Sequence, residues 1–157
     1  MIEQIYTYFN IDMIFMWSNL GVLPFWLVLI IFPQSQICRI FITSIFPIFI
    51  LSLAYGYLFY LFLNEGYDFF KNFELYLGLD AVSYLFTDKV FIILFWLHFL
   101  AINLFCGGWT VKDSQRFGIN KILVSFPLLT TYFIGPIGLT LYWVIRIFYA
   151  KRINLYD

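Results

Sequence analysis

Charged side chains are scarce in this sequence of 157 residues, where they make up 11% of the positions. Soluble domains carry about 25% charged residues. Hydrophobic residues make up 63% of the chain, and phenylalanine alone occurs 21 times. A small domain leaves much of its surface exposed, so it cannot hide this much apolar surface from water. The composition therefore excludes a soluble globular domain and indicates a chain that is solvated by lipid.

Four long stretches of the chain lack Asp, Glu, Lys and Arg altogether. They cover residues 13–38, 40–64, 90–111 and 122–145. Each is at least 22 residues long, and at about 1.5 Å per residue such a helix spans the roughly 30 Å hydrocarbon core of a bilayer. The stretches are continuously apolar rather than alternating, which favours helices over a barrel.

The predicted fold is therefore all-α, an integral membrane four-helix bundle that forms a single transmembrane domain over 1–157. Its helices are expected near residues 13–32, 39–63, 89–107 and 122–149. Gly135 and Pro136, with Gly138 close behind, predict a bend in the fourth helix.

Two further features are expected at the membrane interface. The longest loop contains YLGLDAVSYLF (76–86), whose polar residues recur at helical spacing and predict a short amphipathic helix lying in the interface. A plain loop is the alternative. Gly107 and Gly108 are expected to let the chain turn after the third helix, with Trp109 as an interface anchor.

Residues that bind metals and cofactors are rare as well. One histidine cannot build the multi-histidine sites of membrane desaturases and hydroxylases. The sequence contains no Gly-rich phosphate loop, CxxC pair, HExxH or nucleophile elbow. We expect neither a metal nor a cofactor. Cys38 and Cys106 fall on one side of the membrane, so a disulfide is possible, although free thiols are more common at such positions.

The distribution of charge bears on two questions, namely whether the chain binds nucleic acid and how it is oriented in the membrane. Nine basic and nine acidic residues give no electrostatic case for nucleic acid. One membrane side holds the 33–39 and 108–121 loops, with Arg39, Lys112, Arg116 and Lys121 against Asp113. The other side carries five basic residues, so the positive-inside rule does not settle the orientation. The segment MIEQIYTYFNID has no basic residue, so we expect no removable signal peptide.

The third apolar run, FWLHFLAINLFCGGWT (95–110), contains two polar residues, His98 and Asn103. They lie about 140° apart at about 100° per residue. A helix with polar groups on two sides must be packed on both sides in lipid, so we expect it to be central. An ionisable residue inside a membrane is a functional candidate, but His98 equally fits a neutral side chain that hydrogen-bonds across helices.

Polar residues in the other helices add further candidates. Asn19 is expected to hydrogen-bond a neighbouring helix. Thr130 and Thr131 lie one turn before the expected bend, where their hydroxyls can meet unpaired carbonyls. Arg146, with Tyr142 one turn before it, is either a snorkelling arginine at the boundary or part of a site.

Four blocks of the sequence resemble the small membrane protein family named after the plant abscisic-acid-deficient-four protein, which is needed to make neoxanthin. The blocks are SNLGVLPFWLVLIIFP (18–33), LGLDAVSYLFTD (77–88), WLHFLAINLFCGGWTVKDSQRFGI (96–119) and FPLLTTYFIGPIGLTLYWVIR (126–146). They cover about half the chain. The Trp-x-His and Gly-x-Trp of the third block and the Gly-Pro-x-Gly of the fourth are the most specific.

The resemblance implies a carotenoid or other isoprenoid ligand and, in plants, a chloroplast membrane protein that converts violaxanthin to neoxanthin. This reaction is an isomerisation of an epoxide to an allene, which needs an acid and a base. His98 is the best acid/base candidate on this basis. Asn103 stands where the family usually has an acidic residue, and it can hold an oxygen but cannot exchange a proton. Asp113 is the nearest remaining carboxylate and is expected in a loop.

The predicted site therefore has two catalytic residues, His98 and Asn103, and six substrate-binding residues. The latter are Asn19, Trp109, Thr130, Thr131, Tyr142 and Arg146. The absence of a transit peptide suits a bacterial inner-membrane relative. The alternative function is a non-catalytic membrane protein that binds pigment or lipid, or that assists a partner complex. Whether the chain forms a homo-oligomer stays open.

Overall fold

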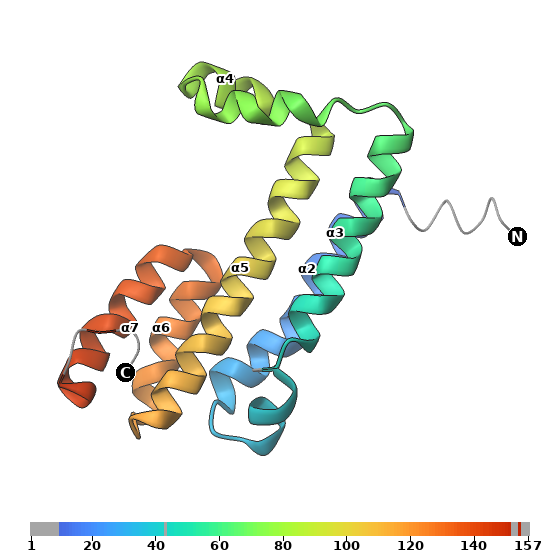
Figure 1. The fold of residues 1–157 in the computed structure, drawn as a ribbon. Helices are drawn as coiled ribbons and strands as arrows, with labels where there is room; N and C mark the ends of the chain where they lie inside the picture. Colours follow the sequence, from blue (N-terminus) through green and yellow to red (C-terminus); the bar gives the residue numbers. More distant parts are fainter. Residues whose placement is uncertain (1–9, 43, 152–153, 155–157) are drawn as a thin grey trace, which may run out of the picture. The chain divides into compact units, whose positions relative to one another are not determined.

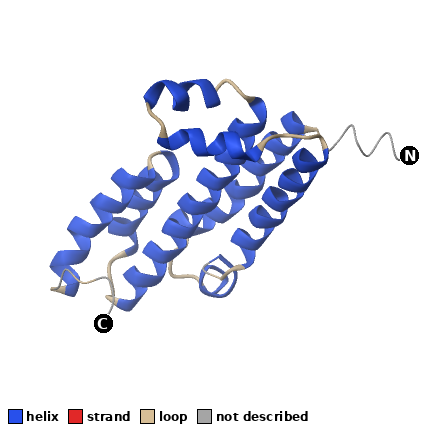
Figure 2. Cartoon of the chain, turned by 45° about the horizontal axis from the view of Figure 1, so that its top comes forward, coloured by secondary structure: helices blue, strands red, loops and turns tan. Residues whose placement is uncertain are grey.

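The computed structural model describes residues 10–42, 44–151 and 154. Every regular element within these ranges is a helix, and none is a strand (Figure 2). The predicted all-α class is confirmed. The described residues fall into two compact units. We call the described parts of Met1–Leu20 and Ile50–Ala101 the first unit, and those of Gly21–Phe49 and Ile102–Asp157 the second unit.

Among the described residues, three helices are long and apolar enough to cross a membrane; Figure 1 shows them as α2, α3 and α5. They are α2 (Ile11–Ile31), α3 (Phe46–Asn64) and α5 (Lys89–Arg116), and the unit boundaries fall within them. These helices match the first three of the four predicted spans. Their long unbroken apolar windows explain why the sequence predicted them so directly.

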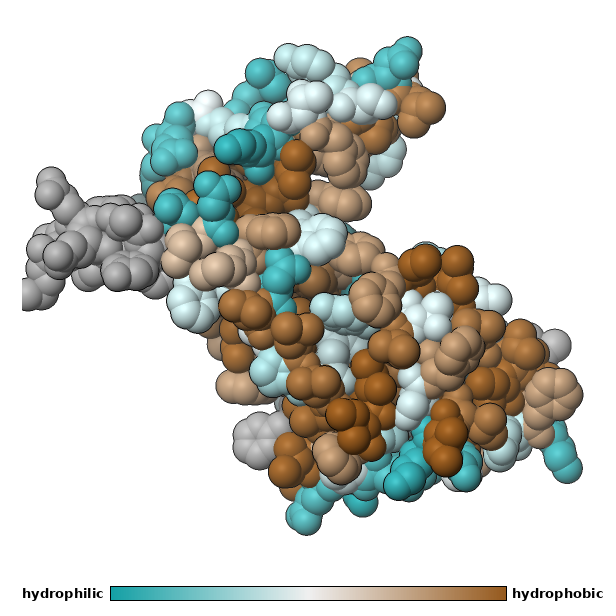
Figure 3. Space-filling model, turned by 180° about the vertical axis from the view of Figure 1, so that it is seen from behind, coloured by the Kyte–Doolittle hydropathy of each residue, from teal (hydrophilic) through white to brown (hydrophobic). Residues whose placement is uncertain are grey.

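The surfaces of these helices suit a lipid environment. Large hydrophobic side chains are exposed along them, among them Leu20, Leu53 and Ile102, and such side chains (brown in Figure 3) are visible on the outer surface. A soluble monomer rarely exposes apolar patches of this extent, whereas lipid tails solvate them. The exposure pattern agrees with the composition in indicating a membrane protein.

The connection from α2 to α3 is longer than expected. It contains a short π-helix, η1 (Cys38–Ile42), and α3 begins at Phe46 rather than near residue 39. Pro47 takes the second position of α3, where its missing N–H leaves no hydrogen bond unmade.

Helix α5 continues past the point where it was expected to end. Gly107 and Gly108 lie inside the helix, and it ends at Arg116. A Cβ atom on Gly107 would lie 2.8 Å from Cη2 of Trp26, so this glycine permits the close approach of α2 rather than a turn. The stop comes at Gly118, which has a φ of 62°, as is typical of the residue after a helix end.

The fourth predicted helix, 122–149, is two helices. α6 spans Lys121–Phe133 and α7 spans Gly135–Ala150, and Ile134 between them has a non-helical φ of −139° and ψ of 81°. The cause is Pro136, because a proline lacks the N–H and its ring excludes the carbonyl four residues earlier. With 13 and 16 residues, the helices are about 20 and 24 Å long and fall short of a 30 Å hydrocarbon core. The expected bend is therefore a break.

α6 and α7 lie side by side as a helical hairpin (Figure 1). They approach each other closely at Gly138, where a Cβ atom would lie 2.5 Å from Cα of Thr131. The hydroxyls of Thr130 and Thr131 donate to the carbonyls of Phe126 and Pro127 at 3.0 and 2.8 Å, one turn back within α6. The hairpin is thus packed backbone to backbone, as small residues allow in membrane proteins.

The connection between α3 and α5 is helical too. It holds a 3₁₀-helix, η2 (Phe69–Tyr76), and α4 (Leu79–Leu85). α4 falls within the segment 76–86 for which an amphipathic helix was expected, rather than the plain loop. Tyr84, within α4, and Tyr76, the last residue of η2, are strongly exposed. Its position in the membrane interface stays a prediction.

Both cysteines are free thiols in the structure. Cys38, in η1, is fully buried, while Cys106, in α5, is half-buried. Burial raises the pKa of the Cys38 thiol to about 11, because the thiolate loses its solvation. A thiol of this kind is poorly reactive at neutral pH.

Replacing Gly138 with Ala is expected to destabilise the hairpin by about 1–3 kcal/mol, because the added methyl meets the backbone of Thr131. The thermal midpoint in detergent should fall. Gly56→Ala in α3 is the matched control, since a Cβ atom there meets nothing within 4 Å. Equal midpoints for the two variants would contradict the close approach.

Cys38 should react with maleimide far more slowly than Cys106 in the folded protein at pH 7.5. Its rate should rise about tenfold per pH unit over the range below its pKa of about 11, because the thiolate is the nucleophile. Mass spectrometry of peptides after timed labelling measures both rates. A Cys38 rate equal to that in the detergent-unfolded chain would be incompatible with its burial.

Candidate functional site

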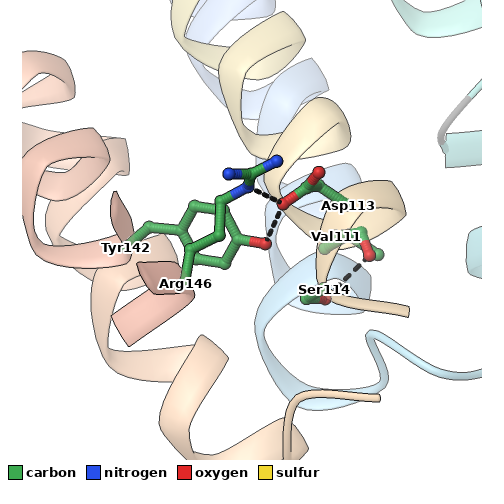
Figure 4. Close-up of polar contacts among 5 residues, drawn as sticks. All are labelled: Val111, Asp113, Ser114, Tyr142 and Arg146. Carbon is green, nitrogen blue, oxygen red and sulfur yellow. Dashed lines mark hydrogen bonds and ion pairs between the residues drawn. The ribbon is translucent and has the colours of Figure 1, made fainter. Parts of the chain in front are cut away.

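A carboxylate, a phenol and a guanidinium meet in the second unit between α5 and α7 (Figure 4). Asp113 belongs to the last turns of α5, while Tyr142 and Arg146 lie one turn apart on the same face of α7. The Tyr142 hydroxyl donates to Oδ2 of Asp113 at 2.6 Å, and Nε of Arg146 donates to the same oxygen at 2.7 Å. We call these three residues the Asp113 cluster.

The Asp113 cluster is buried among aromatic rings. Asp113 is 8% exposed, Tyr142 0% and Arg146 1%. The guanidinium carbon of Arg146 lies 4.9 Å from the ring centroid of Phe117 and 5.9 Å from that of Trp143, distances at which a cation is attracted to a ring face. A buried charge is tolerated only when it is paired and hydrogen-bonded. Arg146 meets this requirement through Asp113.

Trp109 completes the surroundings of the cluster. Its ring meets that of Tyr142 edge to face, with centroids 5.8 Å apart and planes at 90°. This is a preferred geometry for aromatic pairs. It fixes the phenol ring from the side, so that the hydroxyl is held toward Asp113.

The Asp113 carboxylate also borders an open cavity of about 790 Å³. The other residues that line it come from the α2–α3 connection and from the end of α5. They are Gln34, Arg39, Trp109, Lys112, Gln115 and Arg116. We call this cavity the basic pocket. Asp113 therefore belongs both to the buried ion pair with Arg146 and to the lining of a cavity that a ligand can enter. Its carboxylate can accept a proton or a hydrogen bond from such a ligand.

The structure brings together three of the predicted site residues, Trp109, Tyr142 and Arg146, around a residue that was not among them. Arg146 was open to interpretation as a snorkelling side chain or a site residue. It is buried and paired with Asp113 within the second unit. This disfavours the snorkelling interpretation.

Asn103, Thr130 and Thr131 lie at the α6–α7 hairpin. Asn103 is 6% exposed, and a Cβ atom on Gly135 would collide with its Oδ1. Its Nδ2 is buried without a hydrogen-bond partner among the described residues. The hydroxyls of the two threonines donate hydrogen bonds to backbone carbonyls of α6. Whether these residues contact a substrate stays a prediction.

His98 and Asn19 belong to the first unit. His98 is exposed and lines a separate cavity of about 190 Å³. The described residues that share this cavity are Leu51, Ser52, Tyr55, Leu97 and Ala101, and none of them is a predicted site residue. Asn19 donates to the carbonyl of Phe15 at 2.7 Å and accepts a hydrogen bond from the Trp96 indole at 3.1 Å. The predicted pairing of Asn19 with another helix is thus present, and the catalytic role of His98 stays a prediction.

The sequence predicts Asp113 in a loop because Gly107 and Gly108 suggest that the third helix ends before it. A better stop signal lay further along the chain. Arg116 and Gly118 together form the common pattern of a basic last turn followed by a glycine. Placing the helix end by that pattern would have put Asp113 inside the helix.

Among the residues that the structure describes, no group of three or more His, Cys, Asp or Glu side chains could hold a metal ion. The Asp113 cluster offers one carboxylate, which is already engaged by two donors. The chemistry available to it is proton transfer and hydrogen bonding.

In the part of the chain that the structure describes, three helices of membrane-crossing length and a buried ion pair between α5 and α7 indicate an integral membrane protein with an internal polar site. The model of the family described as ABA DEFICIENT 4-like matches residues 13–142. The match covers well over half of the sequence, so the chain belongs to this family, and the resemblance is confirmed. Asp113 and Tyr142 lie within the matched range, and Arg146 lies just beyond it.

The chain is also similar to Protein ABA DEFICIENT 4, chloroplastic, of Arabidopsis thaliana. The two are 23% identical over 136 residues, which are 85% of this chain and 60% of the relative. The chain therefore spans less than two thirds of the length of that protein. No solved structure matches the chain.

Breaking the buried ion pair should destabilise the second unit strongly. Asp113→Asn or Arg146→Gln each leaves a partner buried without its counter-charge, which costs about 3–5 kcal/mol. Tyr142→Phe removes one hydrogen bond and should cost about 1 kcal/mol. Because Asp113 and Arg146 contact each other, the double variant should lose less than the sum of the two single losses. Unfolding of the purified protein in mixed detergent measures these differences.

Asp80→Asn in α4, an exposed carboxylate, is the control and should be close to neutral. Strict additivity of the Asp113 and Arg146 substitutions would show that the pair is not coupled in solution.

Proposed function

We propose that this protein binds a carotenoid or related isoprenoid in the membrane and isomerises an epoxide end group by acid/base chemistry at the Asp113 cluster. Two facts support the proposal: the chain belongs to the ABA DEFICIENT 4-like family, which the resemblance links to neoxanthin synthesis, and a carboxylate and a phenol share a short hydrogen bond in an aromatic, buried setting. That shared hydrogen bond carries the proposal, because it joins a proton donor to a proton acceptor.

The reaction needs one proton delivered and one removed. The epoxide oxygen takes a proton as its C–O bond breaks, which gives a tertiary alcohol. The adjacent polyene carbon loses a proton, and the electrons of that C–H bond form the second double bond of the allene. Substrate and product are isomers, so no oxidant or reductant is required.

In this proposal the Asp113 cluster supplies both steps. The Tyr142 hydroxyl, buried beside Asp113, turns from that carboxylate toward the epoxide oxygen and donates its proton, and the Asp113 carboxylate, which borders the cavity, accepts the proton from carbon. The proton then returns from Asp113 to Tyr142 along the 2.6 Å hydrogen bond, which restores the starting state. Arg146, 2.7 Å from the shared oxygen, stabilises the negative charge throughout the cycle.

A non-catalytic role in binding pigment or lipid is the second candidate. It is favoured by the fact that Oδ2 of Asp113 receives two internal hydrogen bonds, as in a purely structural ion pair. Asn103, where the family usually has an acid, also favours it. The relative's name describes a chloroplastic protein, and a bacterial inner membrane for this chain stays a prediction.

Expression in cells that make violaxanthin tests the enzymatic proposal. The unaltered chain should produce neoxanthin, which chromatography of extracted pigments measures. Tyr142→Phe should lower conversion by about 100-fold or more, because it removes the proposed acid with little change in shape. Tyr149→Phe, an exposed tyrosine on the same helix, is the matched control and should convert normally.

His98→Ala separates the two candidate acid/base residues. Loss of conversion in this variant, with full conversion by Tyr142→Phe, would move the chemistry to the His98 cavity. Pigment profiles that are the same for the unaltered chain, Tyr142→Phe and an empty control would end the isomerase proposal for violaxanthin. Pigment that copurifies without conversion would support the second candidate.

A further inference from the structure

The His98 cavity contains polar side chains that do not belong to the Asp113 cluster. It measures about 190 Å³ and is lined by residues of α3 and α5, namely Leu51, Ser52, Tyr55, Leu97, His98 and Ala101. All of these residues belong to the first unit, whereas the lining of the basic pocket belongs to the second unit. The two cavities are therefore different sites.

The His98 cavity lies near the middle of membrane-crossing helices. Tyr55 is the central residue of α3, which spans Phe46–Asn64, and His98 comes nine residues after Lys89, the first residue of α5. At about 1.5 Å per residue, each lies about 14 Å from the nearer end of its helix. This distance is close to half the thickness of a hydrocarbon core of about 30 Å. We therefore expect the cavity near the centre of the bilayer, where water does not supply hydrogen bonds.

Three polar side chains line this cavity without an internal partner. His98, Ser52 and Tyr55 are exposed and make no hydrogen bond to any residue that the structure describes. Other hydroxyls in the apolar helices are paired, since those of Ser125 and Thr131 donate to the carbonyls four residues earlier at 2.9 and 2.8 Å. An unpaired polar group in hydrocarbon is unfavourable. The three side chains of the cavity are thus available to a ligand.

The size and the apolar lining of the cavity fit one six-membered ring. A protein cavity of about 150 Å³ binds benzene, and the His98 cavity measures about 190 Å³. Leu51 and Leu97 are 6% and 1% exposed, and they supply an apolar wall. Ala101 lies one turn after Leu97 on the same face of α5 and adds little bulk. The cavity is open, so substituents of a ring and an apolar tail can extend from it.

The polar lining selects a ring that carries oxygen. Ser52 and Tyr55 each offer a hydroxyl, and a neutral His98 offers one N–H donor and one acceptor nitrogen. All three side chains can therefore donate to a carbonyl oxygen, and each can also accept from a hydroxyl. Ser52 and Tyr55 come from α3 and His98 comes from α5, so donors line the cavity from both helices.

We propose that the His98 cavity binds an oxygen-bearing six-membered ring of a lipid-soluble molecule, either a quinone or a ring alcohol. The ring packs against Leu51 and Leu97, and its oxygen forms hydrogen bonds with His98, Ser52 and Tyr55. The binding is non-covalent. It goes beyond the isomerisation proposed for the Asp113 cluster and does not depend on it.

The chain has one histidine, so its imidazole can be observed selectively. The full chain, with isotope-labelled nitrogen in histidine only and without a histidine tag, is placed in nanodiscs of phosphatidylcholine. Decylubiquinone should shift the NMR signals of the imidazole until they saturate. Decylbenzene has a ring and a decyl tail but no oxygen, and it should bind about tenfold or more weakly, because it forms none of the hydrogen bonds.

Two variants test the hydroxyls of α3. Ser52→Ala and Tyr55→Phe each remove one hydroxyl at an exposed position and should weaken decylubiquinone binding about three- to tenfold, because one hydrogen bond is lost. Tyr60→Phe is the matched control, since Tyr60 is an exposed tyrosine of α3 that does not line the cavity. It should bind decylubiquinone as the unaltered chain does. Decylubiquinol, which has two hydroxyls in place of the carbonyls, forms the ring-alcohol arm.

Saturable binding that depends on Ser52 or Tyr55 supports the proposal, and the tighter of decylubiquinone and decylubiquinol identifies the kind of ring. Equal affinity for decylbenzene, no saturable shift with any of the compounds, or equal losses in Tyr60→Phe and Tyr55→Phe overturns it. Imidazole signals that change only with the number of protein copies per disc also overturn it, because a second copy would then cover the cavity. No outcome uses pigment conversion as a readout, so failure here is distinct from failure of the isomerase proposal.

Discussion

One carboxylate oxygen, Oδ2 of Asp113, receives the hydrogen bonds of both Tyr142 and Arg146, and all three side chains are buried. An arginine buried to this degree in an apolar chain requires a counter-charge. The requirement constrains the second unit, since α5 must reach far enough to present Asp113 and α7 must run back beside it. The buried ion pair thus depends on two backbone features, a helix that is longer than expected and a break in the last predicted span.

The long apolar runs made most of the fold predictable. α2, α3 and α5 could be predicted because each covers most of a run of at least 22 residues without charge. A run of this length and composition is typical of a helix that crosses a membrane. The end of α5 and the break at Ile134 were harder to predict. Glycine has several uses, and at Gly107 it makes room for Trp26, while at Gly118 it ends a helix. Sequence spacing does not tell these uses apart.

The sequence predicted several residues of the candidate site, but it did not predict which of them are in contact. Trp109, Tyr142 and Arg146 stand out as polar or amphipathic residues in apolar helices, and they do meet. Their partner Asp113 was missed because its assignment depended on the misplaced helix end. His98 attracted attention as the single histidine of the chain, yet its cavity is lined by residues outside the predicted site. A rare residue type such as the single histidine draws attention to a position. Only the structure shows whether that residue is buried and paired with other polar residues.

The short α6–α7 hairpin bears on how the protein is made. Neither helix, at 13 and 16 residues, is long enough to insert as a span by itself. Arg146 would lack its counter-charge if α7 packed before α5, and a buried charge without its partner is unfavourable by several kcal/mol. α5 precedes the hairpin in the chain, so Asp113 is already in place when the last helix leaves the ribosome. The order of elements in the polypeptide therefore matches the order in which its buried charges can be neutralised during synthesis.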